Sequence, residues 1–250
     1  MMIEVRNLKK RFGSLPVLQG VNFSIEKGEA ISIIGVSGGG KSVLLKHLVG
    51  LINPDAGEVF IDGQNIAGLS ERELLPVRRK FGMLFQGAAL FDSMTVEENV
   101  AFILNRERKT SPEDIARRVE EVLDLVGLNG IQKQKPAELS GGMRKRVGLA
   151  RAVIYHPEIL LYDEPTTGLD PIASDTIDRL IIRVVQKLQV TSIAVTHDMR
   201  SARRIGQRIL MLHEGRIYAD QKPEDLFKSK DPVIYRFVNG ISELKKDDEL

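Results

Sequence analysis

The sequence predicts an α/β protein in which a mainly parallel sheet carries a phosphate-binding loop, together with an antiparallel β piece and an inserted helical subdomain. Three observations lead to this fold class. A Gly-rich loop at residues 35–42 stands between a strand-like and a helix-like segment. Short apolar runs that end in polar residues recur along the chain, as is typical of strands buried on both faces of a parallel sheet. Between two of these runs lies a stretch with the periodicity of amphipathic helices.

Length and composition limit the classes of protein to which the chain can belong. The chain has 250 residues, 42% of them hydrophobic and 28% charged, so we expect one globular domain over residues 1–250. The absence of cysteine excludes disulfides and thiolate metal sites and, without clustered histidines, predicts no zinc site. Because 36 basic residues are interleaved with 34 acidic ones, we expect no nucleic-acid partner. No apolar stretch approaches the roughly 20 residues that span a bilayer, which predicts a soluble, cytoplasmic chain.

The first candidate site is a phosphate-binding loop (P-loop) at residues 35–42, which matches G-x-x-x-x-G-K-[ST]. Glycines let backbone N–H groups approach phosphate oxygens, and the helix-like segment 43–49 adds its positive N-terminal dipole. The loop consists of Gly35, Val36, Ser37, Gly38, Gly39, Gly40, Lys41 and Ser42. We expect Lys41 to reach the β and γ phosphates of ATP and the Ser42 hydroxyl to bind Mg²⁺. An ordinary Gly-rich turn is the alternative.

Other strands follow from local patterns. Residues 59–61 and 64–66 flank Asp62-Gly63, a pair that tolerates the positive φ angles of a type I′ turn, and therefore predict an antiparallel hairpin. The apolar runs 81–85, 159–162 and 191–195 suit strands of the parallel sheet. In open α/β sheets, chemistry gathers at the carboxyl ends of such strands.

Residues 89–155 are predicted to form the inserted helical subdomain. Thr95 and Glu98 match a capping box, and Ser111-Pro112 matches the start of a second helix. This second helix is expected to end at Gly127, and its apolar face comprises Ile115, Val119, Val122, Leu123 and Val126. A further helix follows Asp170-Pro171, with Ile177, Leu180, Ile181, Val184 and Leu188 on one face. We expect both faces to pack in the core and the charged tail 243–250 to fray.

Two carboxylates, Asp163 and Glu164, follow the apolar run 159–162. A buried strand that leads directly into two negative charges needs a compensating cation, and Mg²⁺ bound with ATP would supply it. Asp163 would hold the metal, while Glu164, which points in a different direction, would polarise the water that attacks the γ-phosphate. A pair of solvated acids in a turn before Pro165 is the alternative.

Polar residues follow two other strands and complete the expected γ-phosphate environment. Gln86 follows the run 81–85, and its amide oxygen can bind the metal or the water. His197 follows the run 191–195, and its imidazole can donate a hydrogen bond to the γ-phosphate in the transition state. Either residue alone would more often be an ordinary surface residue, but their convergence with the P-loop favours catalytic roles.

A second anion site is predicted at residues 139–152. Ser140 is a helix N-cap, and Gly141-Gly142 expose backbone N–H groups at the start of the helix. Within one chain, the P-loop and this second anion site cannot easily contact the same nucleotide. In two chains related by a twofold axis, the P-loop of one chain can face the second site of the other. The segment therefore predicts a dimer, and a normally capped surface helix is the alternative.

The chain resembles the nucleotide-binding subunits of ATP-binding cassette (ABC) transporters. The resemblance covers nearly the entire chain and is carried, in this order, by the P-loop, Gln86, Leu139-Ser140-Gly141-Gly142, Ile159 to Glu164, Gly168-Leu169-Asp170 and His197. It implies an ABC ATPase fold, namely a P-loop NTPase (RecA-like) core with an antiparallel β subdomain and an inserted α-helical signature subdomain.

The same resemblance implies roles for further residues. Phe12 would stack on adenine, although core packing is the alternative for any such aromatic. Ser140, Gly141 and Gly142 would contact the γ-phosphate from the opposite subunit, and Asp170 would communicate across the dimer. Val43, among the nucleotide-binding positions, stands where a second hydroxyl residue commonly contacts the α-phosphate, so that side-chain contact must be absent.

Local features look most like the ATPase of Mla-type phospholipid-transport systems. They are the segments 42–48 and 85–93, Met143 in place of the usual glutamine after the signature glycines, and Tyr162 before the acidic pair. This resemblance implies an ATP-hydrolysing subunit, with ATP and Mg²⁺ as cofactors, that powers phospholipid transport between membranes. The alternatives are an ABC ATPase for another solute and a soluble ABC ATPase outside transport.

The expected partners follow from this resemblance. They are a second copy in a head-to-tail, ATP-dependent homodimer, an integral-membrane permease, an MCE-domain lipid-binding protein and a small accessory regulatory subunit. The chain would lie peripherally on the cytoplasmic face of the bacterial inner membrane. We expect a short permease helix to dock on residues 87–91, with core packing of Leu90 and Phe91 as the alternative.

Within the single domain, three parts are expected. Residues 1–88 and 156–225 would form the α/β and β core, 89–155 the helical subdomain, and 226–250 a C-terminal helix and tail.

Overall fold

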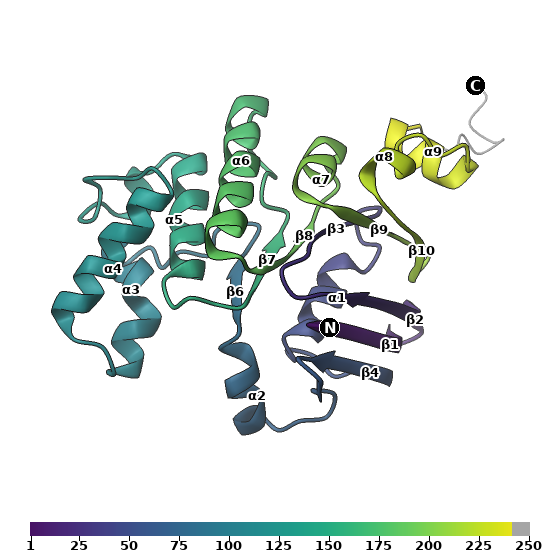
Figure 1. Cartoon of the computed structure of the whole chain (residues 1–250), viewed down its shortest axis with the longest axis horizontal. Helices are drawn as coiled ribbons and strands as arrows, with labels where there is room; N and C mark the ends of the chain where they lie inside the picture. The colour runs from purple at the N-terminus through teal and green to yellow at the C-terminus, as the bar shows by residue number, and fades with distance from the viewer. Residues whose placement is uncertain (242–250) are drawn as a thin grey trace.

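A six-stranded sheet forms the centre of the computed structural model, which describes residues 1–241 (Figure 1). In spatial order its strands are β10 (Arg216–Gln221), β9 (Arg208–His213), β3 (Ala30–Ile34), β8 (Thr191–Val195), β7 (Ile159–Asp163) and β6 (Phe81–Leu84). All run parallel except β10, which pairs antiparallel with β9. The predicted parallel strands are therefore confirmed, although β6 ends at Leu84 and leaves the Phe85 side chain exposed.

A second sheet is antiparallel and has the order β2-β1-β4-β5. Its strands are β1 (Ile3–Phe12), β2 (Leu15–Ile25), β4 (Ala56–Ile61) and β5 (Gln64–Asn65). Phe60 pairs with Asn65 and Ile61 with Gln64, while Asp62 and Gly63 take positive φ angles of 52° and 78° in the turn. The predicted hairpin is therefore confirmed, because only this pair of residues has to adopt the left-handed region.

The core between the two sheets is built around α1 (Lys41–Leu48), the helix that follows the P-loop. Leu44, Leu45 and Leu48 on this helix are fully buried and pack in one cluster with strand residues from both sheets. Burial of these leucines holds the first turn of α1, and with it the P-loop, against the central sheet.

Helices α3 (Val96–Glu107), α4 (Pro112–Leu125) and α5 (Gly141–Val153) stand together at one end of the molecule, between β6 and β7 in the chain (Figure 1). The capping box of Thr95 and Glu98 and the Ser111 cap are present as predicted. In the predicted apolar face of α4, Ile115 is half-buried and the other residues are buried. Gly127 follows the helix with φ 66°, which explains why the helix ends there.

Five further α-helices lie in the described part of the chain. Helix α6 (Pro171–Leu188) buries Ile177, Leu180, Ile181 and Val184 as predicted, with Leu188 half-buried against the same core. Helix α7 (Met199–Ile205) follows β8, α2 (Glu71–Arg78) precedes β6, and α8 (Pro223–Leu226) and α9 (Pro232–Asn239) lie at the end opposite α3 to α5 (Figure 1).

Two sequence expectations concern the ends and surfaces of the chain. The charged tail 243–250, which was expected to fray, lies outside the described residues. Among residues 1–241, no helix has both the length and the apolar character to cross a bilayer.

Candidate active site

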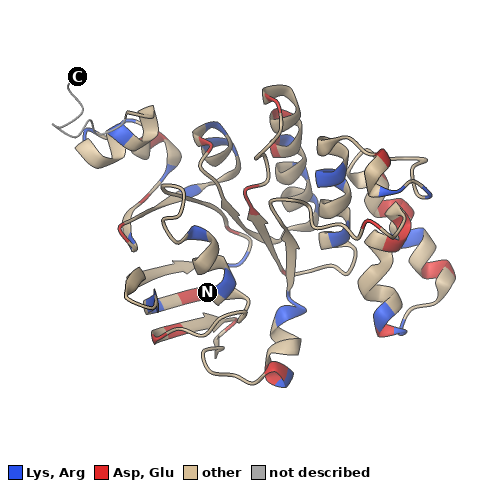
Figure 2. Ribbon diagram, turned by 180° about the vertical axis from the view of Figure 1, so that it is seen from behind, with Lys and Arg blue, Asp and Glu red and all other residues tan. Residues whose placement is uncertain are grey.

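The structure brings the predicted polar residues to one edge of the central sheet. Strands β3, β8, β7 and β6 are neighbours that all point the same way, so their carboxyl ends meet. The P-loop follows β3, Gln86 follows β6, Asp163 ends β7 and His197 follows β8. Figure 2 shows acidic residues where a central strand ends, which agrees with the position of Asp163 and Glu164.

The backbone of the P-loop requires glycine at its first position. A Cβ on Gly35 would lie 2.4 Å from the carbonyl oxygen of Leu212, because the loop crosses β9 at close range. Gly38 has φ +74°, and a Cβ there would meet no atom within 4 Å, so the loop is open on this side. Val36, Ser37 and Gly38 are exposed, as a loop that must meet phosphate requires.

Lys41 folds back across the P-loop. Its Nζ donates to the carbonyl oxygens of Gly35 at 2.8 Å and Val36 at 3.0 Å, and only 6% of the residue is exposed. Burial lowers the pKa of Lys41, and the nearby carboxylates of Glu164 and Asp163 partly oppose that shift. A largely buried ammonium therefore stands at the centre of an open, N–H-rich loop, which suits an anionic ligand.

Ser42 and Asp163 form the pair expected at a magnesium site. The Ser42 hydroxyl donates to Oδ1 of Asp163 at 3.1 Å. Burial raises the pKa of Asp163, whereas the Ser42 hydrogen bond lowers it. A half-buried carboxylate beside a hydroxyl supplies the hard oxygen donors that Mg²⁺ prefers, so the residues fit this ion. The Gln86 side chain lies exposed after β6, beside this edge of the sheet.

Glu164 is fixed by contacts on several sides and is only 12% exposed. Its φ angle of +52° lies in the left-handed region, which costs a non-glycine residue about 1–3 kcal/mol. Its N–H donates to the Val195 carbonyl at 2.9 Å, and Oε2 accepts from the Thr167 hydroxyl at 3.0 Å. The other oxygen, Oε1, lies 4.0 Å from the Nζ of Lys41. The carboxylate is thus aimed at the P-loop.

His197 stands beside Glu164 and is open to solvent. Its Nδ1 lies 2.7 Å from Oε2 of Glu164, and 59% of its side chain is exposed. The structure therefore joins two residues that the sequence placed only after two different strands.

Phe12 lies at the end of β1 with half of its surface exposed, and the Lys10 ammonium is 5.7 Å from its ring centroid. Core packing, the alternative for Phe12, is wrong because the ring is not buried. An exposed aromatic at this position is available to stack on a planar ligand.

The second predicted anion site lies apart from the P-loop in the same chain. Ser140 caps α5 by accepting the Met143 N–H at 3.3 Å, as predicted. A hollow of about 480 Å³ adjoins it, and its lining includes Ser140, Gly141, Gly142, Gly168 and Asp170. Asp170 accepts the N–H groups of Ile172 and Ala173 at 2.9 Å and so caps α6, and these backbone hydrogen bonds, led by that of Ala173, lower the pKa of its carboxyl.

Two contacts at the site involve residues that the sequence did not single out. Thr167 donates to the Glu164 carboxylate. The feature of the sequence that could have indicated this contact is a hydroxyl residue three positions after the acid. Lys145 on α5 donates to the carbonyl oxygens of Gln86 and Glu164. Helical periodicity could have indicated that Lys145 is buried, because it lies four residues before Leu149 on the buried face of α5.

Comparisons with known proteins agree with this geometry. Residues 18–167 match the family described as "ABC transporter". A solved structure titled as a dimeric, post-hydrolysis state of the ATP-binding cassette MJ0796 bound to ADP and Pi matches with a TM-score of 0.81 and 35% identity. The match covers 89% of this chain and 99% of that one.

Three curated relatives carry names that point to different cargoes. Protein TRIGALACTOSYLDIACYLGLYCEROL 3, chloroplastic, of Arabidopsis thaliana is 43% identical over 96% of this chain and 74% of its own length. The intermembrane phospholipid transport system ATP-binding protein MlaF of Haemophilus influenzae is 40% identical over 97% and 92%. The methionine import ATP-binding protein MetN of Mesorhizobium japonicum is 44% identical over 86% and 59%.

Proposed function

The chain belongs to the ABC transporter family, and on this premise we propose that it powers phospholipid transport between membranes through a partner permease. As an ABC ATPase, it hydrolyses ATP to drive transport. The observation that supports its catalytic site best is the position of the Glu164 carboxylate, which lies between the Lys41 ammonium and the His197 imidazole at the end of β7.

We assign the steps of hydrolysis to the residues at this edge of the sheet. The P-loop N–H groups and Lys41 bind the β and γ phosphates, and Phe12 stacks on the adenine. Ser42, Asp163 and Gln86 would hold Mg²⁺, which when bound neutralises phosphate charge. Glu164 accepts the proton of the attacking water, and His197 donates a hydrogen bond to the γ-phosphate.

We further propose that the active unit is a head-to-tail homodimer. The hollow beside Ser140 is lined by glycines and the N-terminus of α5, so it can receive a γ-phosphate from the partner's P-loop. Asp170, at the same hollow, would pass the state of one site to the other. The MJ0796 structure, which has the same fold, is titled as dimeric, and this supports a dimer for the present chain.

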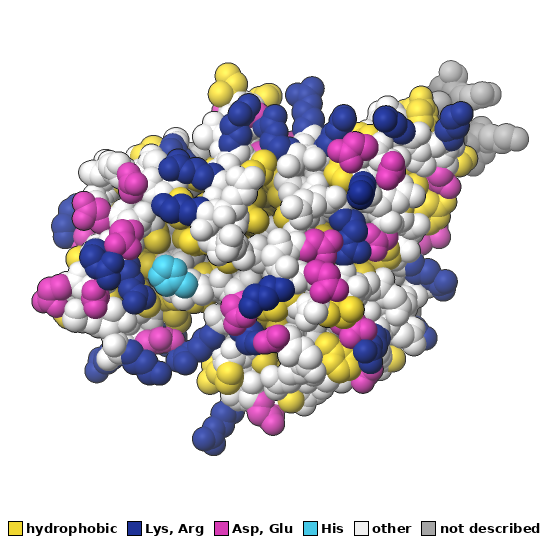
Figure 3. Space-filling model, in the orientation of Figure 1, with side chains coloured by type: hydrophobic (Ala, Val, Ile, Leu, Met, Phe, Trp, Pro, Cys, Tyr) yellow, Lys and Arg dark blue, Asp and Glu magenta, His cyan; other side chains and the backbone are white. Residues whose placement is uncertain are grey.

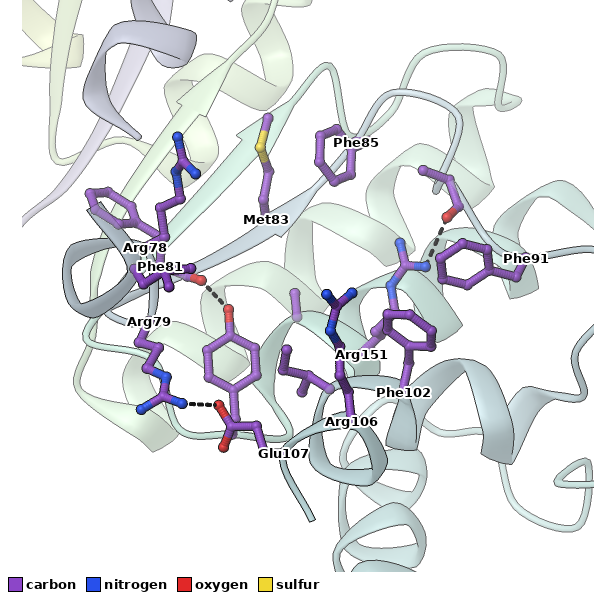
Figure 4. Close-up of a pocket in the computed structure, with 15 residues that line it drawn as sticks. Arg78, Arg79, Phe81, Met83, Phe85, Phe91, Phe102, Arg106, Glu107 and Arg151 are labelled. Carbon is purple, nitrogen blue, oxygen red and sulfur yellow. Dashed lines mark hydrogen bonds and ion pairs between the residues drawn. The ribbon is translucent and has the colours of Figure 1, made fainter. Parts of the chain in front are cut away.

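A groove between α2 and α3 is the proposed permease docking surface. It has a volume of about 1120 Å³ and is lined by residues of α2, β6, α3 and α5, together with the loop after β6 (Figure 4). Phe85 and Phe91 are exposed in it, and the rings of Phe91 and Phe102 lie 4.7 Å apart. Exposed aromatics in a hollow are the anchors that an inserted apolar helix uses.

Charged residues form the rim of this groove. Arg79, which directly follows α2, pairs with Glu107 of α3 at 2.8 Å, and the two side chains approach each other in Figure 4. Arg151 donates to the carbonyl oxygens of Ala88 and Ala89 at 2.8 Å each, and so holds the loop that follows Gln86. Movement of a docked helix would therefore reach Gln86 through this loop. Of the predicted anchors, Leu90 packs on the core and Phe91 faces the groove.

Phospholipid is the cargo we favour, because two close relatives carry lipid names and the local features of the sequence agree. An MCE-domain protein, a small regulatory subunit and the cytoplasmic face of a bacterial inner membrane belong to the same proposal. Basic and acidic side chains are interspersed on the face shown in Figure 3, which supports the expectation of no nucleic-acid partner. Another solute is the second candidate, favoured by the methionine import relative.

The decisive experiment is transport by the purified complex. The chain would be isolated from membranes together with its partner subunits. Mass spectrometry would identify the subunits and the lipids bound to the complex, and the complex would then be reconstituted in vesicles. We expect ATP-dependent transfer of labelled phospholipid that Glu164→Gln abolishes. ATP-dependent uptake of methionine without lipid transfer would favour the second candidate.

A further inference from the structure

Lys145 is a buried cation that no part of the proposed chemistry uses. It lies on α5 and is 5% exposed, and its Nζ donates to the carbonyl oxygens of Gln86 and, at 3.2 Å, of Glu164. Arg144 and Arg146, its neighbours on this basic helix (Figure 2), donate instead to the carbonyls of Leu139 and Gly127. Of these three adjacent cations, Lys145 alone contacts residues proposed for catalysis.

The burial of Lys145 has an electrostatic cost that a simple packing role would avoid. Desolvation lowers the pKa of its ammonium, while the carboxylates of Glu164 and Asp163 oppose that shift. A leucine would cover the same apolar face of α5 without that penalty. The buried ammonium donates hydrogen bonds to two carbonyl oxygens, which an apolar side chain cannot do.

The contact to Glu164 acts on a residue whose backbone has an unusual conformation. Glu164 has φ +52°, and its N–H is held by the Val195 carbonyl of β8. Lys145 donates to the C=O of the same residue from α5, so the backbone N–H and C=O of Glu164 both have hydrogen-bond partners. The side-chain carboxylate of this residue lies between Lys41 and His197.

We propose that Lys145 is a positioning residue that ties the signature helix α5 to the backbones of Glu164 and Gln86. Because α5 begins at Gly141, any shift of this helix when Ser140–Gly142 meets the partner's nucleotide is passed through Lys145 to the catalytic residues. Contact between Ser140–Gly142 and the partner's nucleotide would thereby change the positions of Glu164 and Gln86 in the same chain. The inference rests on the catalytic roles proposed for Glu164 and Gln86.

The test separates turnover from nucleotide binding. Lys145→Met keeps the aliphatic stem and removes the donor, so kcat should fall about 10- to 100-fold while the Kd for ATP stays within about twofold. Lys145→Arg, which keeps a charged donor, should recover most of the lost kcat. Lys133→Met removes another lysine near α3, where the side chain is 84% exposed, and should leave kcat unchanged.

The arms of the experiment give distinct outcomes. If Glu164→Gln is inactive but Lys145→Met turns over normally, the role of Lys145 is wrong and that of Glu164 stands. If Glu164→Gln itself is active, the proposed base is wrong. Should Lys145→Met unfold, as judged by circular dichroism, Lys145→Gln provides an uncharged amide donor on a shorter side chain and should give an intermediate kcat. Wild-type kcat in that variant would overturn the inference.

Discussion

The Nδ1 atom of His197 lies 2.7 Å from the Oε2 atom of Glu164, although the two residues follow different strands. A neutral imidazole can donate from only one of its nitrogens. While Nδ1–H faces the carboxylate, Nε2 can donate to a phosphate only if the ring binds a second proton. The proposed roles therefore require that, with ATP bound, the pair either separates or takes up a proton.

Glu164→Gln should separate catalysis from binding. The amide keeps the size of the side chain but cannot accept the proton of water, so we expect turnover to fall at least about 100-fold with ATP affinity retained. Lys41→Ala should weaken ATP binding as well, because it removes the buried ammonium. Steady-state hydrolysis and nucleotide titration measure both effects, and near-normal turnover in the Gln variant would exclude Glu164 as the base.

The dimer proposal predicts complementation between two inactive subunits. Lys41→Ala disables one P-loop, and Gly142→Asp places a negative charge in the signature loop. A Cβ at Gly142 meets only the Ala173 Cβ at 4.0 Å, so the fold should tolerate this change. A verified heterodimer retains one intact composite site and should regain about half of the wild-type activity per dimer. Two inactive homodimers and an equally inactive heterodimer would contradict contact in trans.

A charge in the groove should block the permease. Ala89→Glu places a carboxylate beside the exposed aromatics, and Ala89 already has a positive φ of 49°, so the substitution adds no new backbone strain. We expect ATP binding to persist while co-purification with the permease is lost or hydrolysis no longer drives transport. Ala56→Glu, at an exposed position on β4, is the matched control and should assemble normally. Wild-type assembly and transport by Ala89→Glu would place docking elsewhere.

The stability of the chain should carry a pH dependence that originates at Asp178. This buried α6 residue accepts the Ser201 hydroxyl at 2.9 Å through Oδ2, while Oδ1 has no partner among the described residues. Burial raises the pKa of Asp178 to about 6 from 3.8. The folded chain therefore binds this proton more tightly than the unfolded chain, and stability is lost as pH rises from about 4 through 6.

Asp178→Asn removes this titration. Between pH 4.5 and 7.5, the free energy of unfolding of the wild type should fall by about 1–3 kcal/mol relative to the variant. Urea titrations at several pH values measure the difference. Asp92→Asn, at an exposed position, should keep the wild-type pH dependence. Parallel pH curves for the wild type and Asp178→Asn would show that Asp178 is not the source.

Local patterns explain why so much of the fold could be predicted. The Asp62-Gly63 turn, the Thr95–Glu98 capping box and the buried face of α6 each depend on residues within one or two turns of chain. The convergence of Gln86, Asp163 and His197 also followed, because parallel strands bring their carboxyl ends to one edge. The end of β6 and the exposure of Phe12 did not follow, since each depends on what packs against the residue.

By itself, the sequence determined that this chain has a P-loop, an acidic strand end and a second glycine-rich helix start, because these are spacings along the backbone. Only the tertiary structure decided that Lys145 reaches across to Gln86 and Glu164, that His197 meets Glu164, and that Phe85 and Phe91 line one groove. Such contacts join residues far apart in the chain. Their distances are set by how the helices pack on the sheet, which no local spacing encodes.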